Sequence, residues 1–146
     1  MCNNLVYLAG PMGGLSMKKA NGWRDLAEWY LGENGIDTYN PVAKLKEWPG
    51  VKDKIKVSYE SQGFRNKEVV TSDLFWIDRS DIILSDLTGY GTMSFGTPFE
   101  FGYSYAKGKP IVTVCDEELA CHPFVSEMSI VYVDLYDALD FICSLM

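Results

Sequence analysis

The chain has 146 residues, of which 47% are hydrophobic and 23% are charged. This composition is typical of one globular domain, here spanning residues 1–146, and argues against a disordered chain. The formal net charge of −7 argues against a nucleic-acid polymer as partner, because proteins of that class carry a basic face. A small anionic ligand is compatible with this charge, since a few backbone N–H groups at a helix start can hold one phosphate.

The cysteines and the first apolar run indicate the compartment. The four cysteines are scattered, with no C-x-x-C pair and no secretory leader before them, so we expect reduced thiols in a cytoplasmic protein. The run 5–9 is too short to span a membrane, and no membrane association is expected. Cys115, Cys121 and His122 have no zinc-ligand spacing, so neither a metal nor a cofactor is expected.

Short apolar runs alternate with helical patterns along the chain. The predicted strands are 5–9, 36–39, 82–84, 111–115 and 130–133. The predicted helices are 16–34, 65–79, 97–107 and 135–145, while 117–128 is mixed and 42–63 is a long loop. Strands that are apolar throughout and alternate with helices predict a parallel sheet covered on both faces, which is a small doubly wound α/β sandwich. Ligands of such sheets bind beyond the carboxyl ends of the strands, which are followed here by loops 10–16, 86–95 and 116–122.

The first of these loops is rich in glycine. Its residues Gly10, Met12 and Gly13 follow a strand and precede a helix, so their N–H groups are candidates to bind a substrate anion. A tight turn without any ligand is the alternative. The loop fits neither the dinucleotide nor the Walker pattern. Asp86, which opens the second loop, is a further candidate for substrate binding.

Glu100 admits two interpretations. Thr97, Pro98 and Glu100 have the spacing of a helix N-cap, first residue and capping-box acid. In that case Glu100 bonds the backbone of Thr97. Alternatively, its aromatic flanks Phe99 and Phe101 place an ionised carboxylate at a helix start in an apolar cleft, where it is a good nucleophile toward a sugar carbon.

Asp73 lies within the apolar stripe of a predicted helix, one turn from Val69 and Ile77. A carboxylate facing a core is unfavourable without a partner, so either a buried ion pair or a proton donor with a raised pKa is expected. An acid of this kind together with a nucleophilic carboxylate predicts glycoside chemistry.

Four segments carry a resemblance to a known family. They are V-Y-L-A-G-P-M at 6–12, D-I-I-L-S-D-L at 81–87, G-T-P-F-E-F-G-Y at 96–103 and A-K-G-K-P-I-V at 106–112. Nearly the whole chain resembles the nucleoside 2-deoxyribosyltransferase family, least in 42–63. The resemblance implies a flavodoxin-like (Rossmann-like) five-stranded fold. It also implies cleavage of the N-glycosidic bond of a 2′-deoxynucleoside through a covalent deoxyribosyl–enzyme ester and transfer to another nucleobase, without a cofactor.

The resemblance also implies roles for single residues. Glu100 stands at the family's nucleophile, Asp73 at the acid/base carboxylate that contacts the base, and Tyr7 at the tyrosine that orients the nucleophile. His122 stands where the transferases usually have an asparagine that reaches the sugar 5′ end across a subunit interface. A homo-oligomer (dimer, tetramer or hexamer) with shared active sites is therefore expected.

Ser94 departs from the transferase pattern, in which many members carry an aspartate that takes the 5′-hydroxyl. In the related 2′-deoxynucleoside 5′-monophosphate N-hydrolases a serine and a glycine two residues on hold the phosphate, and Ser94 and Gly96 match them. A neutral hydroxyl tolerates a phosphate that an aspartate would repel. Base exchange on free deoxynucleosides is the leading hypothesis, hydrolysis of a nucleoside monophosphate is the alternative, and a non-catalytic nucleotide-binding module is the third.

Overall fold

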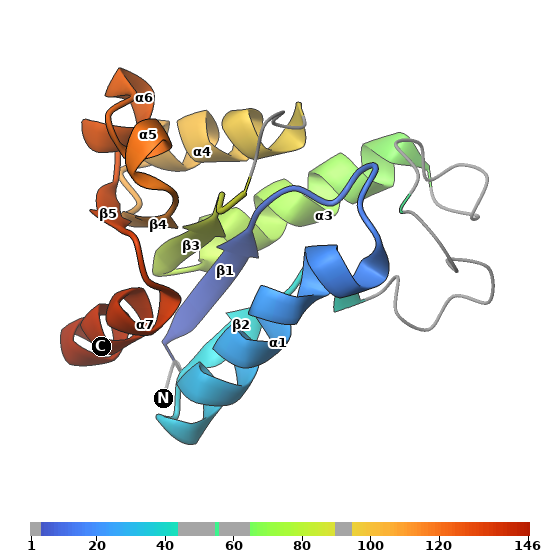
Figure 1. Ribbon diagram of the computed structural model, residues 1–146. Helices are drawn as coiled ribbons and strands as arrows, with labels where there is room; N and C mark the ends of the chain where they lie inside the picture. Colours follow the sequence, from blue (N-terminus) through green and yellow to red (C-terminus); the bar gives the residue numbers. More distant parts are fainter. Residues whose placement is uncertain (1–3, 44–54, 56–64, 90–94) are drawn as a thin grey trace.

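The computed structural model describes residues 4–43, 55, 65–89 and 95–146, and its centre is a parallel β-sheet. The sheet has five strands in the order β2-β1-β3-β4-β5 (Figure 1). The strands are β1 (Leu5–Ala9), β2 (Asp37–Tyr39), β3 (Ile82–Asp86), β4 (Ile111–Val114) and β5 (Ile130–Tyr132). All four strand pairs are parallel. The predicted doubly wound α/β fold with a five-stranded parallel sheet is confirmed.

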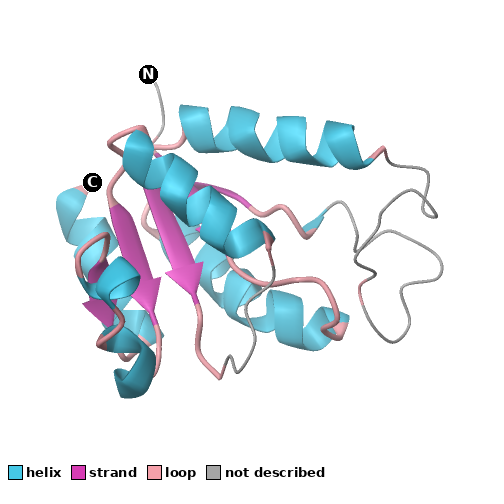
Figure 2. Ribbon diagram, turned by 90° about the horizontal axis from the view of Figure 1, so that it is seen from above, coloured by secondary structure: helices cyan, strands magenta, loops and turns pink. Residues whose placement is uncertain are grey.

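Helices cover both faces of this sheet (Figure 2). They are α1 (Met17–Glu33), α3 (Asn66–Arg79), α4 (Gly96–Ala106), α5 (Glu117–Ala120), α6 (Pro123–Ser126) and α7 (Leu135–Leu145). Apolar residues of α1 and α7 pack with those of the central strands in one core cluster. Residues of α3 and α4 pack on the opposite face of β1, β3 and β4 in a second cluster.

The alternation along β1 connects the two cores. Val6 and Leu8 face the α1/α7 cluster, whereas Tyr7 and Ala9 face the α3/α4 cluster, because successive side chains of a strand point to opposite faces. All five residues of β3 are buried, as expected for an inner strand covered on both sides. Tyr7 is therefore a core residue whose side chain lies on the α3/α4 face of the sheet.

The strand order locates the ligand site that this fold offers. The chain passes from β1 outward to β2 and returns to β3 on the other side of β1, so the order reverses between β1 and β3. In open α/β sheets the crevice beyond the carboxyl ends at such a switch point binds ligands. The loop after β1 begins with Gly10 and β3 ends at Asp86, so both residues lie at this point.

Two details of the helices differ from prediction. Helix α4 begins at Gly96 rather than at Thr97, because the Thr97 side chain is 3% exposed and turned inward instead of closing the helix end. The predicted capping box at this helix is therefore wrong. In α1 the buried positions include Arg24, Ala27 and Leu31, whereas Trp23 and Tyr30 are only half-buried.

Ser16 caps α1 as its side chain accepts a hydrogen bond from the Lys19 N–H, and Gly35 follows the helix with a φ of +73°. Among the helices that the structure describes, none is long and apolar enough to cross a lipid bilayer.

Candidate active site

Tyr7 and Glu100 meet on the α3/α4 side of the sheet. The Tyr7 hydroxyl donates a hydrogen bond of 3.0 Å to Oε1 of Glu100. Tyr7 comes from the middle of β1 and is fully buried, so its ring has little freedom to move. Glu100 comes from the second turn of α4. The sheet and the helix thus fix the carboxyl group from two directions.

Asp73 is the second carboxylate of this site. It lies on α3 between Val69 and Ile77 and is 7% exposed. Burial is the largest cause that raises the pKa of Glu100 to about 8, and the negative charge of Asp73 is the next. The hydrogen bond from Tyr7 and the positive charge of Arg24 act in the opposite direction. Burial and the charge of Asp73 thus favour the protonated form of Glu100, whereas the start of a helix favours the ionised form.

Aromatic rings continue from Tyr7 toward the edge of the sheet. The ring of Tyr7 stacks on that of Tyr39 with 5.6 Å between centroids, and Tyr39 stacks on Trp76 at 4.7 Å. The Tyr39 hydroxyl is 3.3 Å from Oγ of Ser72, the residue before Asp73. These contacts hold β1, β2 and α3 together on the side where Tyr7 and Asp73 lie.

The loop after β1 approaches the loop after β3. A Cβ at Gly10 would lie 3.2 Å from the carbonyl oxygen of Asp86 and 3.0 Å from Cζ2 of Trp23, so a larger residue would force these groups apart. Met12 and Gly13 follow in the same loop and are partly buried. Burial raises the pKa of Asp86, whose Oδ1 accepts the Thr88 N–H. The structure thus brings Gly10 and Asp86 together at the switch point.

Arg24 is a buried site residue that the sequence analysis missed. It is 0% exposed, lies on α1, and its guanidinium donates to backbone carbonyls at the end of β1. The pattern that could have predicted it is the one that pointed to Asp73, a charged residue on the core-facing stripe of a helix. Arg24 lies four residues after Ala20 and three before Ala27, both buried, so a charged residue occupies the core-facing stripe of its helix.

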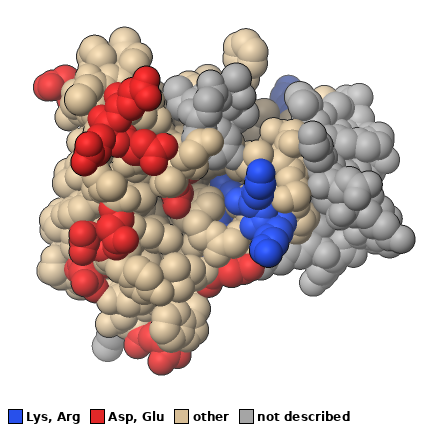
Figure 3. Space-filling model, viewed as in Figure 1, with Lys and Arg blue, Asp and Glu red and all other residues tan. Residues whose placement is uncertain are grey.

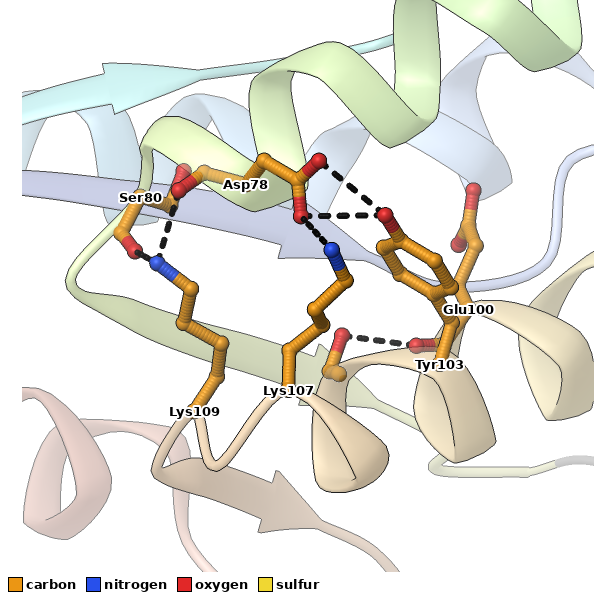
Figure 4. A network of polar contacts seen from close by, with 7 residues as sticks. Asp78, Ser80, Glu100, Tyr103, Lys107 and Lys109 are labelled. Carbon is orange, nitrogen blue, oxygen red and sulfur yellow. Dashed lines mark hydrogen bonds and ion pairs between the residues drawn. The ribbon is translucent and has the colours of Figure 1, made fainter.

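A surface network joins the helices that carry the two carboxylates (Figure 4). The Tyr103 hydroxyl, one turn after Glu100 on α4, lies 3.0 Å from both carboxylate oxygens of Asp78 on α3. Lys107 forms an ion pair of 3.3 Å with the same carboxylate, and Lys109 donates to the carbonyls of Asp78 and Ser80 at the end of α3. These contacts fix α4 against α3.

The remaining predicted residues are His122, Gly96 and Ser94. His122 is exposed, precedes α6, and lines an apolar pocket of about 250 Å³ with Phe101, Phe124 and Met128 among others. Gly96 is the first residue of α4. Ser94 lies outside the described residues. Within those ranges, no group of three or more His, Cys, Asp or Glu side chains could hold a metal ion.

The charges on the face shown in Figure 3 are unevenly distributed. Basic side chains gather near the start of α1, whose first turn carries Lys18 and Lys19, while acidic side chains form separate patches at the left and in the lower part of this face. The start of α1 follows directly on the loop 10–16. Two lysines therefore lie beside that loop despite the net charge of −7.

The comparison with protein families identifies the class. A family model described as Nucleoside 2-deoxyribosyltransferase matches residues 6–132. The chain belongs to the nucleoside 2-deoxyribosyltransferase family. This membership supports an enzyme of the nucleoside deoxyribosyltransferase class. None of the curated proteins compared with the chain matches it significantly.

Solved structures share the fold at low sequence identity. The 2-desoxiribosyltransferase from Leishmania mexicana has a TM-score of 0.69 and 14% identity, with 97% of each chain covered. The CMP N-glycosidase of Clostridium botulinum has a TM-score of 0.64 and 16% identity, and 98% of this chain and 100% of that chain are covered. A molybdenum cofactor binding protein from Rippkaea orientalis has a TM-score of 0.61 and 14% identity, with coverages of 99% and 98%.

Proposed function

We propose that the protein cleaves the N-glycosidic bond of a 2′-deoxynucleoside and transfers the deoxyribosyl group to another nucleobase or to water. The observation that carries this proposal is the partly buried carboxyl group of Glu100, held by the Tyr7 hydroxyl at 3.0 Å and acted on by the charge of Asp73. Family membership supports the reaction class. Two carboxyl groups in one partly dry site are what displacement at a sugar carbon requires.

The mechanism assigns one proton to the two carboxyl groups. Burial, and after it the negative charge of Asp73, raises the pKa of Glu100 to about 8, so we expect the pair to hold a single proton near neutral pH. With that proton on Asp73, this residue donates it to the departing base while the Glu100 carboxylate attacks the anomeric carbon and forms the ester. An incoming base or water then attacks the same carbon, the ester bond breaks, and Asp73 takes back a proton.

Substitution of Glu100 tests the reaction. We expect Glu100→Gln to lower turnover by several orders of magnitude with the fold intact, because an amide can accept the Tyr7 hydrogen bond and cannot act as the nucleophile. Mass spectrometry of the wild-type protein quenched during turnover should find one deoxyribosyl group on the peptide that contains Glu100. A Glu100→Gln protein with full activity would contradict the proposal.

The same variant separates an enzyme from a binding module. A non-catalytic nucleotide-binding protein would show no turnover of any nucleoside, and Glu100→Gln would change only its affinity. Calorimetry with a deoxynucleoside beside product analysis distinguishes the two, because the proposed enzyme must release free base.

Hydrolysis of a nucleoside 5′-monophosphate is the second candidate. The basic side chains at the start of α1, beside the glycine loop, favour it, and one structural neighbour is a CMP N-glycosidase. Two charge-assisted hydrogen bonds of about 1.5–3 kcal/mol each would lower the KM of a monophosphate about a hundredfold or more relative to its nucleoside. Ser94→Asp should then reverse this preference by repulsion. Equal KM values, unchanged in Ser94→Asp, would leave base exchange as the function.

A further inference from the structure

Arg24 is a permanently charged side chain without solvent exposure. Its Nε donates to the Leu8 carbonyl at 3.3 Å and its Nη2 to the Gly10 carbonyl at 2.7 Å, while Nη1 donates to the Ala20 carbonyl one turn earlier in α1. The guanidinium also lies over the ring of Trp23, 4.6 Å from the centroid. Burial of a charge is unfavourable by several kcal/mol, so a purely structural anchor at this place would be better made by a neutral residue.

The carbonyls that Arg24 holds belong to the last part of β1. Leu8 directly follows Tyr7, and Gly10 is the first residue after the strand. Gly10 also leaves room for the guanidinium, since a Cβ there would lie 3.2 Å from Nη2 of Arg24. The position of Tyr7, and with it the hydrogen bond to Glu100, therefore depends on a strand end that is tied to α1 through Arg24.

The charge of Arg24 acts on two carboxylates at the carboxyl edge of the sheet. The groups that act on Glu100 are Tyr7 from β1, Asp73 from α3 and Arg24 from α1, and only Arg24 among them is positive. The charge of Arg24 also lowers the pKa of Asp86, the last residue of β3. Hydrogen bonds from Thr88 act in the same direction, and the charge of Asp116 acts in the opposite direction. A fixed positive charge behind a carboxylate favours the ionised form that a nucleophile needs.

We propose that Arg24 is a positioning residue of this site: its guanidinium fixes the end of β1 that directs Tyr7 to Glu100, and its charge stabilises the Glu100 carboxylate from behind the strand. Arg24 acts on Glu100 through the end of β1 and through its charge, so it is a positioning residue and not a catalytic one. The catalytic consequence rests on the proposed function, whereas the structural and electrostatic statements hold for the ligand-free protein.

The test compares Arg24→Lys with Arg24→Gln. Lysine keeps the charge and loses the planar fork, and glutamine keeps a hydrogen-bond donor and loses the charge. Arg79→Gln, an exposed position on α3, is the control for loss of a positive charge elsewhere. The Glu100 carboxyl is titrated in the full chain by NMR with ¹³C-labelled glutamate and assigned with Glu100→Gln, so that no substrate is needed.

We expect the Glu100 pKa to rise by about half a unit or more in Arg24→Gln and to stay within about 0.3 units of the wild type in Arg24→Lys and Arg79→Gln. Activity should fall at least about tenfold in both Arg24 variants, because both lose the geometry. An unchanged Glu100 titration in Arg24→Gln would overturn the electrostatic role. Full activity of Arg24→Lys would overturn the positioning role.

If Arg24→Gln does not fold, Gly10→Ala replaces it. The added Cβ displaces the guanidinium without removing it, and we expect the Glu100 pKa to rise and the Tyr7 environment to change in the NMR spectrum. An unaltered Glu100 titration in Gly10→Ala would again contradict the proposal. Failure of the proposed function would appear separately, as absence of turnover in a wild-type protein whose Glu100 titration still depends on Arg24.

Discussion

At the scale of single residues, the proposed activity depends on the protonation state of the Glu100–Asp73 pair. Burial and the charge of Asp73 raise the pKa of Glu100 to about 8, so the singly protonated pair exists over the neutral range. This form has both a donor and a nucleophile. When the last proton leaves, Asp73 can no longer protonate the base. We expect kcat/KM to fall as pH rises through about 8 for bases that leave only when protonated, in a rate profile measured from pH 5 to pH 10.

The same proton links stability to pH. The pKa of Glu100 is higher in the folded protein, at about 8, than the ordinary 4.5, so the folded state binds more protons between these values. The contribution to the free energy of unfolding is complete below about pH 4.5 and is lost as pH rises through about 8.

Glu100→Gln removes this dependence. Relative to the wild type, its free energy of unfolding should gain up to about 1.4 kcal/mol per pH unit across that window. Urea unfolding at several pH values checks this, with the exposed Glu117→Gln as control. A pH-independent difference between wild type and Glu100→Gln would contradict the raised pKa.

Asp73→Asn should affect both the proton transfer to the base and the pKa of Glu100. Asparagine can donate a hydrogen bond and cannot transfer a proton, so release of a poorly leaving base should slow by about 10²–10⁴-fold. The Glu100 pKa should fall, because the repulsion from Asp73 is gone, and the decline in rate near pH 8 should disappear. Rates measured for good and poor leaving bases separate the roles. Equal slowing for both would indicate that Asp73 only positions the substrate.

At the scale of the elements, the pairing of α3 with α4 sets the distance between the two carboxylates. The Asp78 carboxylate accepts a hydrogen bond from the Tyr103 hydroxyl of α4 and forms an ion pair with Lys107 at the end of that helix (Figure 4). Lys109 donates a hydrogen bond to the Asp78 carbonyl near the end of α3. The Ser104 hydroxyl donates to the Glu100 carbonyl at 2.6 Å, within α4 itself. The exposed ion pair contributes little by itself, so the tyrosine–carboxylate contact is the main polar link.

Tyr103→Phe tests this link. It removes the hydroxyl and keeps the ring, so we expect a loss of about 0.5–1.5 kcal/mol in the free energy of unfolding and a lower kcat with little change in KM. Tyr105→Phe, on the same helix and 54% exposed, should change neither. Thermal melts and steady-state rates are the measurements. A Tyr103→Phe protein with normal kcat would show that the carboxylates keep their places without this link.

The elements also show where sequence patterns were sufficient. The apolar runs predicted all five strands, and α7 was predicted with its observed ends, because its pattern is strongly amphipathic and Asp134 caps it. The start of α4 was misplaced, since a threonine turned into the core gives the same letters as a threonine cap. Glu100, Asp73 and Tyr7 were singled out and lie together, whereas the shift in the Glu100 pKa and the role of Arg24 depend on tertiary contacts that no local spacing records.

At the scale of the whole molecule, exposed aromatic side chains indicate which surfaces are candidates for contacts between subunits. Trp29 and Tyr105 are exposed, whereas Tyr30, Trp76 and Tyr103 are half-buried because they pack against the two cores. Among the described phenylalanines, the three most exposed lie at the start of α4 and on α6, whereas Phe75 (45%) lies on α3. The three are Phe95 (100% exposed), Phe99 (55%) and Phe124 (68%).

These phenylalanines predict the assembly. Apolar side chains grouped near a site edge are typical of a partner surface, and closed symmetric oligomers are the commonest use of one. We expect light scattering to give a small multiple of 16.4 kDa, and Phe124→Asp to lower this mass and reduce activity together. Trp29→Asp, which alters a residue 60% exposed on α1, is the matched control and should leave the mass unchanged. A wild type that scatters as a monomer and remains fully active on dilution would contradict the expectation that neighbouring subunits share each site.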